Sequence, residues 1–171
     1  MAATAETTQA DVRAKAGKYL TFRLGPETYG VEVLKVREII RLMEITAVPQ
    51  MPPYLKGVIN LRGRIVPVVD LRLKFSMPHA EATGETCIVV VQVTQPSGTK
   101  THIGIVVDSV EEVAQLSQAD IEGVPDFGSQ LSADYLLGMA KVKGCVKTLL
   151  DIDRMLSAAT VPLIEKVQSS S

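Results

Sequence analysis

A repeated segment constrains the fold of this chain more than any other feature of its sequence. Residues 54–75 align without a gap on residues 135–156 when the sequence is shifted by 81 positions. Apolar residues match at most of the aligned positions, which alone would be weak evidence. Five aligned pairs are identical: Tyr54 and Tyr135, Leu55 and Leu136, Gly57 and Gly138, Gly63 and Gly144, Asp70 and Asp151. Two glycines and an aspartate in the same register indicate a duplicated structural unit, because such residues serve specific turns and caps.

The duplication extends upstream. Residues 30–33 align on residues 104–107, and residues 36–39 align on residues 110–113. Within the first copy, the apolar runs 58–61 and 65–69 flank the turn 62–64, which predicts a β-hairpin. We therefore expect two copies of a β-rich unit, each with a strand pair, a short helix or turn, a hairpin and a capping aspartate. Two small barrels packed against each other fit this pattern, with a crevice between them as the natural binding place.

The remaining elements follow from periodicity and turn residues. Strands are expected at residues 19–24, 29–33, 45–48, 87–94 and 102–108. A short helix is expected where Val36, Ile39 and Ile40 recur at helical spacing. A capping-box spacing predicts a helical turn at residues 117–120, and a last short helix is expected at residues 154–156. Residues 122–132 are expected to form a loop, and residues 1–17 and 158–171 disordered tails.

Composition narrows the function. The chain has 171 residues, 46% of them hydrophobic, with 18 basic and 19 acidic side chains. This balance lacks the basic excess of a nucleic-acid-binding protein, and the 4% aromatic content offers few surfaces on which bases could stack. Residues 1–18 contain no apolar core of a signal peptide, and no run reaches the length of a membrane span, so a cytoplasmic location is expected.

No metal, cofactor or catalytic site is expected. The cysteines Cys87 and Cys145 and the histidines His79 and His102 show no metal-ligand spacing. No nucleophile, Walker or dinucleotide motif is present. Asp70 and Asp151 could suggest a carboxylate pair, but their equivalent positions before two short helices favour capping.

The basic turn of residues 62–64 has two interpretations. Most charged hairpin tips are simply solvated, which would give Arg62 no specific role. Alternatively, its planar guanidinium suits a carboxylate or an interface contact, and Lys143 takes the same position in the second copy. Glu38 is then either a salt-bridge partner of Arg62 or a second contact residue. Gly63, between two strands, is expected to adopt a positive φ.

The sequence resembles the CheW family of bacterial chemotaxis coupling proteins. The resemblance is carried by residues 29–39, 104–113, 135–138 and 149–152, and above all by Asn-Leu-Arg-Gly at residues 60–63 followed by Val-Pro-Val-Val-Asp at residues 66–70. It covers residues 18–156, nearly the whole chain that is expected to be ordered.

This resemblance implies a mainly β fold of two five-stranded, SH3-like barrels around a shared hydrophobic core, with a few short helices. One CheW-like domain is expected over residues 18–157, with halves at about residues 19–76 and 86–157 and with strand exchange between the halves possible.

The resemblance also implies a non-catalytic adaptor that couples transmembrane chemoreceptors to the regulatory domain of a CheA-type histidine kinase in membrane-associated arrays. It implies receptor binding by Val36, Glu38 and Arg62 and, with weaker support, by Cys87, and turn support by Gly57 and Gly63. It assigns no residues to the kinase contact. The alternative is a stand-alone SH3-like module that binds a peptide or metabolite outside chemotaxis.

Overall fold

The computed structural model describes residues 15–123 and 135–156. Strands dominate: β1 (Gly17–Leu24), β2 (Glu27–Glu32), β3 (Val36–Arg41), β4 (Leu55–Leu61), β5 (Arg64–Asp70), β6 (Cys87–Thr94), β7 (Lys100–Val107), β8 (Ser109–Leu116), β9 (Ile121–Glu122), β10 (Leu136–Val142) and β11 (Cys145–Leu150). The short helical segments are η1 (Val33–Lys35), α2 (Leu71–Lys74) and η2 (Gln118–Asp120). A further helical turn covers residues 152–156.

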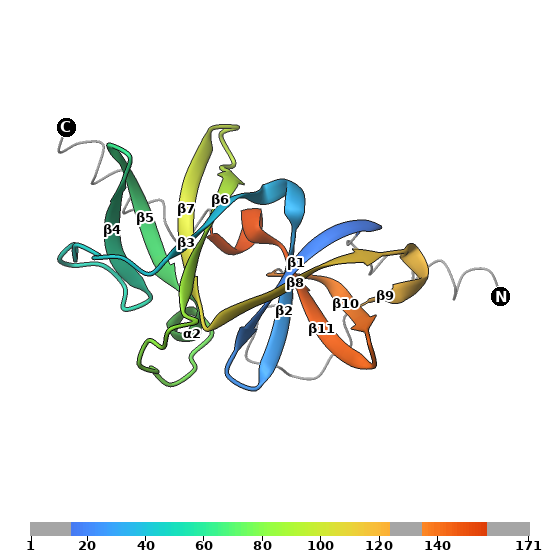
Figure 1. Cartoon of the computed structure of the whole chain (residues 1–171). Helices are drawn as coiled ribbons and strands as arrows, with labels where there is room; N and C mark the ends of the chain where they lie inside the picture. Colours follow the sequence, from blue (N-terminus) through green and yellow to red (C-terminus); the bar gives the residue numbers. More distant parts are fainter. Residues whose placement is uncertain (1–14, 124–134, 157–171) are drawn as a thin grey trace.

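The strands form two sheets that lie side by side (Figure 1). The first has the order β3-β6-β7-β5-β4 and is called the first barrel below. The second, β8-β1-β2-β11-β10-β9, is called the second barrel. The second barrel contains the two-residue strand β9 in addition to the five strands that were expected.

Each barrel takes strands from both sequence repeats. The first barrel combines β3, β4 and β5 of the first repeat with β6 and β7 of the second. The second barrel combines β1 and β2 of the first repeat with β8, β10 and β11 of the second. Apart from the parallel junctions, where β5 meets β7 and β11 meets β2, the ladders are antiparallel. The chain therefore crosses between the barrels twice, after β2 and after β7.

A glycine lies at each of the two parallel junctions. Gly104 of β7 lies opposite Val68 of β5, and Gly30 of β2 lies opposite Leu149 of β11. A Cβ on Gly104 would lie 2.7 Å from Cγ2 of Ile88, and one on Gly30 would lie 3.0 Å from Cδ2 of Leu149. These two glycines are aligned in the repeat. Gly30 makes room for its parallel partner β11, whereas Gly104 makes room for Ile88 of β6, the antiparallel neighbour of β7.

A shared core joins the barrels. Strand β6 shows how: its odd-numbered residues Val89, Val91 and Val93 belong to the largest buried cluster, which also contains Phe22 of β1 and Leu156 of the final helical turn. Its even-numbered residues face a smaller cluster inside the first barrel, formed by Ile59, Val66, Val68, Ile88 and Val90. The second barrel has an inner cluster of its own around Tyr19 and Leu149. Strand β6 is buried on both faces, which explains its unbroken apolar sequence.

The helix expected around residues 36–40 is wrong, because these residues form β3. Its ladder with β6 places Ile39 opposite Val89 and Ile40 opposite Ile88. β-Branched side chains pack well on a pleated sheet. Burial alternates along β3, but the polar Glu38 takes a half-buried position and the apolar Ile39 an exposed one, so the sequence lacks the apolar–polar alternation of a strand. The helical segment instead lies just before, in η1.

Other boundaries differ by a few residues. Residues 45–48 do not form a strand, and only an isolated bridge links Thr46 to Val58. β1 begins at Gly17, one residue before the expected start of order. Most of the expected loop at residues 122–132 lies outside the described residues, as do residues 1–14 and 157–171.

The expected caps are confirmed. Oδ1 of Asp70 accepts hydrogen bonds from the backbone N–H of Arg72 at 2.9 Å and of Leu73 at 3.4 Å. Oδ1 of Asp151 accepts one from the N–H of Arg154 at 3.1 Å. Ser117 and the third residue after it form the expected capping box at η2. The two aspartates thus satisfy helix N-termini, as their repeat positions indicated.

Asp108 occupies the second crossover, between β7 and β8. Its carboxylate accepts a two-pronged contact from Arg72, with Nε at 2.9 Å and Nη2 at 2.6 Å, and a hydrogen bond from the N–H of Gly25 at 2.7 Å. The hydrogen bond from Arg72, despite the opposing effect of burial, lowers the pKa of Asp108. The ionised form is therefore the form that stabilises the fold.

We expect Asp108→Asn to destabilise the protein in a pH-dependent manner. A depressed pKa contributes stability above the unfolded value of about 3.9, and this contribution is lost as the pH falls through the folded value. Urea unfolding at pH 7 should show the variant less stable than the wild type, and the difference should shrink at about pH 3. An equal difference at both pH values would contradict this role for the Asp108 charge.

The glycines of the β4–β5 hairpin should differ in their tolerance of a side chain. Gly57 has φ +142° at a bulge, and an added Cβ would lie 2.7 Å from the carbonyl carbon of Thr46 and 2.9 Å from Cα of Ala47. Gly63 has φ +85° but open space around it. We expect Gly57→Ala to cost roughly 3 kcal/mol and Gly63→Ala about 1 kcal/mol in urea unfolding. A reversed order would contradict the account.

Candidate functional site

The β4–β5 turn presents Arg62 in an uncommon backbone conformation. Arg62 has φ +53° and Gly63 has φ +85°, which is the positive pair that a two-residue type I′ hairpin requires. The positive φ expected for Gly63 is confirmed. The side chain of Asn60 supports the turn by accepting a hydrogen bond from the N–H of Gly63 at 2.8 Å. Few residues other than glycine, asparagine and aspartate adopt this conformation, so an arginine here is notable.

Arg62 forms a two-pronged ion pair with Glu38. Its Nη1 donates to Oε2 at 3.2 Å, and its Nη2 contacts Oε1. The hydrogen bond from Arg62 lowers the pKa of Glu38, and the same bond raises the pKa of Arg62. The arginine side chain is 71% exposed, so the contact is screened by solvent and adds little stability. Its geometric effect is to hold the guanidinium at one place on the surface.

This pair spans the open side of the first barrel. Glu38 belongs to the edge strand β3 and lies opposite Val90, whose side chain belongs to the inner cluster of that barrel. Arg62 reaches it from the tip of the hairpin that ends the same sheet. The pair Glu38–Arg62, called the first ion pair below, thus links the two edges of the first sheet.

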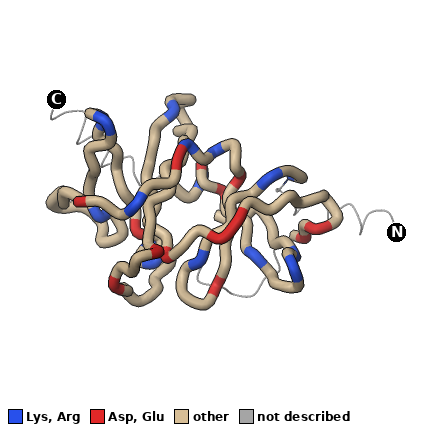
Figure 2. The backbone as a smooth tube through the Cα atoms, viewed as in Figure 1, with Lys and Arg blue, Asp and Glu red and all other residues tan. Residues whose placement is uncertain are grey.

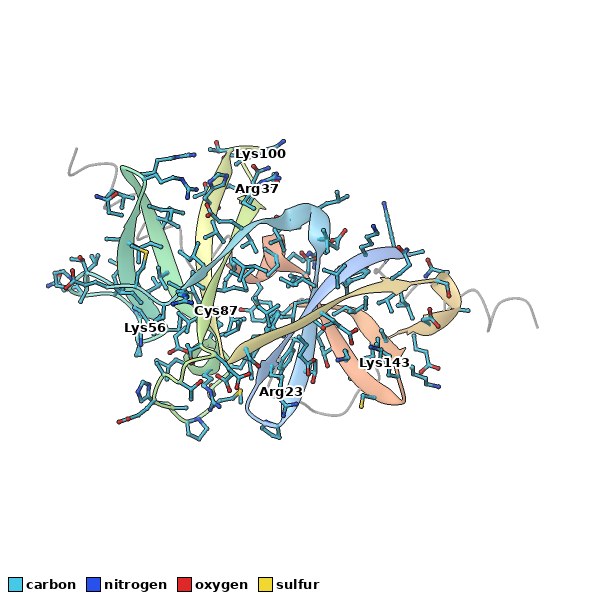
Figure 3. All side chains as sticks on the ribbon, in the orientation of Figure 1. Arg23, Arg37, Lys56, Cys87, Lys100 and Lys143 are labelled. Carbon is cyan, nitrogen blue, oxygen red and sulfur yellow. The ribbon has the colours of Figure 1, made fainter. Side chains whose placement is uncertain are left out.

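The second barrel carries the same arrangement. Lys143 has φ +52° and Gly144 has φ +80° at the tip of the β10–β11 hairpin. Nζ of Lys143 donates to Oε1 of Glu112, on the edge strand β8, at 2.9 Å. Lys143 lies on that hairpin of the second barrel in Figure 3. The hydrogen bond lowers the pKa of Glu112 and raises that of Lys143. This pair, Glu112–Lys143, is called the second ion pair.

Exposed aliphatic residues accompany both pairs in equivalent positions. In the first barrel they are Ile39, next to Glu38 in β3, and Ile65 in β5, which are 46% and 50% exposed. In the second they are Val113 and Val146, at 54% and 57%. Each barrel therefore presents an ion pair and two exposed aliphatic side chains. One of these lies on the strand that carries the glutamate and the other on the second strand of the hairpin, a composition typical of contact surfaces.

The charges around the two pairs differ. Lys, Arg, Asp and Glu are interspersed along both barrels (Figure 2). In the first barrel, burial and then the charges of Arg64 and Arg37 lower the pKa of His102 on β7. In the second barrel the neighbour of Glu112 is Glu111, which pairs with the buried Lys147 at 2.9 Å. The first surface is thus more basic than the second.

The other expected site residues lie apart from the first ion pair. Val36 and Cys87 are both partly buried and pack against the shared core. They lie towards opposite ends of the β3–β6 ladder, since Val36 is opposite Val91 and Cys87 is opposite Arg41. Burial raises the pKa of the Cys87 thiol. The structure therefore brings Glu38 and Arg62 together, while Val36 and Cys87 face the junction between the barrels.

The second ion pair is absent from the sequence-based predictions, although a signal for it was present. The repeat aligns Glu38 on Glu112 and Arg62 on Lys143, so a partner for one basic tip implies a partner for the other.

Among residues 15–123 and 135–156, no group of three or more His, Cys, Asp or Glu side chains could hold a metal ion. None of the helices in this part of the chain has the length and apolar character needed to span a bilayer.

The family model described as a CheW-like domain matches residues 18–160, across both barrels. The chain belongs to the CheW family. It is 36% identical over 153 residues to the chemotaxis protein CheW of Klebsiella aerogenes, covering 90% of this chain and 89% of the relative. It is 30% identical over 150 residues to CheW of Bacillus subtilis, covering 85% and 92%.

A solved CheW structure has the same fold. The scaffolding protein TtCheW of Thermoanaerobacter tengcongensis superimposes with a TM-score of 0.73 at 28% identity, covering 82% of this chain and 92% of that protein. Together with the two sheets and the shared core, this match confirms the expected pair of SH3-like subdomains.

Replacing the tip residues should separate backbone strain from the ion pair. Arg62→Ala and Arg62→Gly both remove the contact with Glu38, but only glycine adopts φ +53° without strain. We expect a higher urea midpoint for Arg62→Gly than for Arg62→Ala, and the same order for the two substitutions of Lys143. Equal midpoints within each pair of variants would contradict a strained tip.

Proposed function

We propose that this CheW-family chain is a non-catalytic adaptor that couples chemoreceptors to a CheA-type histidine kinase. The observation that carries the proposal is the family match across both barrels. Five carboxylates have structural partners, since Asp70 and Asp151 cap helices and Asp108, Glu38 and Glu112 form ion pairs. As an adaptor it acts in the cytoplasm and is recruited to membrane-associated receptor arrays.

The receptor site of the proposal includes the first ion pair. An amphipathic helix that docks on a protein needs apolar contacts and a few polar anchors. The first barrel offers Ile39 and Ile65 as exposed apolar residues and a guanidinium held in place by Glu38. The fork of Arg62 can exchange Glu38 for a receptor carboxylate without a change of backbone.

The other expected contact residues complete the proposed site. Val36 and Cys87 face the junction of the barrels, where the receptor's helical hairpin would reach apolar side chains. Gly57 and Gly63 support the β4–β5 hairpin that carries Arg62. The regulatory domain of the kinase would occupy surface outside this site.

We expect Arg62→Ala to weaken receptor binding by roughly tenfold, the loss typical of one interface anchor. Binding of a purified receptor tip fragment can be measured by titration calorimetry. Lys143→Ala is the matched control, because it removes the equivalent ion pair from the second barrel.

The control should bind the receptor fragment like the wild type, and circular dichroism should show both variants folded. Unchanged affinity for Arg62→Ala, or the same loss in both variants, would refute the assignment of the receptor site to the first barrel.

A further inference from the structure

Two carboxylates each bond to residues of both barrels. Asp108, at the second crossover, receives the fork of Arg72 from α2, which follows β5 of the first barrel. It also receives the N–H of Gly25 from the β1–β2 turn of the second barrel. The backbone N–H of Asp108 donates to the carbonyl of Arg23 in β1 at 3.0 Å. The side chain and backbone of Asp108 thus tie α2, the crossover and the β1–β2 hairpin together.

Asp153 makes the corresponding contacts on the other side of the molecule. It belongs to the helical turn that follows β11, the second strand of the β10–β11 hairpin of the second barrel. Its Oδ1 accepts the N–H of Thr94 at 2.9 Å, at the end of β6 in the first barrel. Its Oδ2 accepts from Nζ of Lys35 at 2.7 Å, in η1 at the first crossover. Both crossovers are therefore fixed by an ion pair.

The repeat relates these contacts, with their polarity reversed. Arg72 and Asp153 are aligned by the shift of 81 residues. Gly25 and Thr94 are equivalent, because each lies four residues after the residue that pairs with the aligned glycine, Thr21 with Gly30 and Val90 with Gly104. In the pair Arg72–Asp108 the helix supplies the cation and the crossover supplies the anion. In the pair Lys35–Asp153 the helical turn supplies the anion and the crossover supplies the cation. Different residue types thus maintain the same connection.

The shared core holds the barrels together but does not by itself set their angle. Apolar burial is non-directional, whereas charge-assisted hydrogen bonds favour one geometry. The four partners are at least partly shielded from solvent, with side chains 18% and 32% exposed for Arg72 and Asp108 and 30% for both Lys35 and Asp153.

We propose that Arg72–Asp108 and Lys35–Asp153 are positioning pairs that fix the angle between the two barrels. Each joins a crossover to the helix after a hairpin and to the end of a strand of the opposite barrel. They thereby hold the first and second ion pairs, one on each barrel, in a fixed relative orientation.

The consequence for coupling rests on the proposed function. An adaptor that contacts two partners loses less entropy on assembly if its two binding faces are already oriented. Variants that loosen the angle should weaken the ternary complex more than they weaken the binding of either partner alone. A residue that only stabilises the fold would not produce this difference.

The angle can be measured on the isolated protein by electron–electron distance spectroscopy. Cys145 on the second barrel is exposed and can carry one spin label, and Ser97→Cys at the β6–β7 turn of the first barrel can carry the other. Cys87 would be replaced by alanine in every sample. Figure 3 shows that Cys87 and Lys143, two residues before Cys145, lie on different barrels.

We expect Asp108→Asn and Asp153→Asn each to broaden the distance distribution, and the double variant to broaden it further, to roughly twice the wild-type width. Arg72→Lys keeps the charge but loses the fork, so it should broaden the distribution less than Asp108→Asn. Glu122→Gln is the matched control, since its ion pair with Lys141 lies within the second barrel, and it should leave the width unchanged.

An unchanged width in folded Asp108→Asn, Asp153→Asn and double variants, even with a lower melting temperature, would overturn the proposal. The distance measurement involves no partner, so it decides the positioning role independently of the proposed function. If the wild type bound neither a receptor fragment nor a kinase regulatory domain, the adaptor function would fail while the distances would still test the pairs.

Discussion

The two parallel junctions between β2 and β11 and between β5 and β7 are the constraint on which the rest of this structure depends. Each inserts a strand pair of one repeat beside a hairpin of the other, and each has a glycine at the junction that is tightly packed against a neighbouring strand. A side chain on Gly30 or Gly104 would meet Leu149 or Ile88. Because the exchange is reciprocal, neither repeat can complete its barrel alone, and the two barrels fold as one unit.

The exchange also explains the large shared core. β1 and β6 each leave one repeat and enter the barrel of the other, so their apolar residues lie between the barrels as well as inside them. Each fully buried Leu, Ile or Val contributes about 1.5–3 kcal/mol, far more than an exposed ion pair. The hydrophobic contacts therefore supply most of the stability. The ion pairs at the crossovers and hairpin tips favour one orientation of the elements that they join.

Duplication gives this scaffold two similar surfaces that differ in chemistry. Both hairpin tips place a basic residue at positive φ against a glutamate on an edge strand. The first uses an arginine, whose fork suits a carboxylate, and has Arg37 and Arg64 nearby. The second uses a lysine with Glu111 beside its partner. The two hairpin tips thus share one geometry but present different chemistry at the surface.

The sequence by itself determined the features that depend on local chemistry. The 81-residue shift predicted the duplication, and Gly63 predicted the turn between β4 and β5. The positions of Asp70 and Asp151 predicted the helix caps, and the motif at residues 60–70 predicted membership of the CheW family. Only the tertiary structure decided that residues 36–41 form a strand, because pairing with β6 outweighs their helical spacing. It also decided which repeat supplies each strand and which residues face Arg62 and Lys143. Those choices depend on contacts between residues far apart in the chain, which local periodicity does not encode.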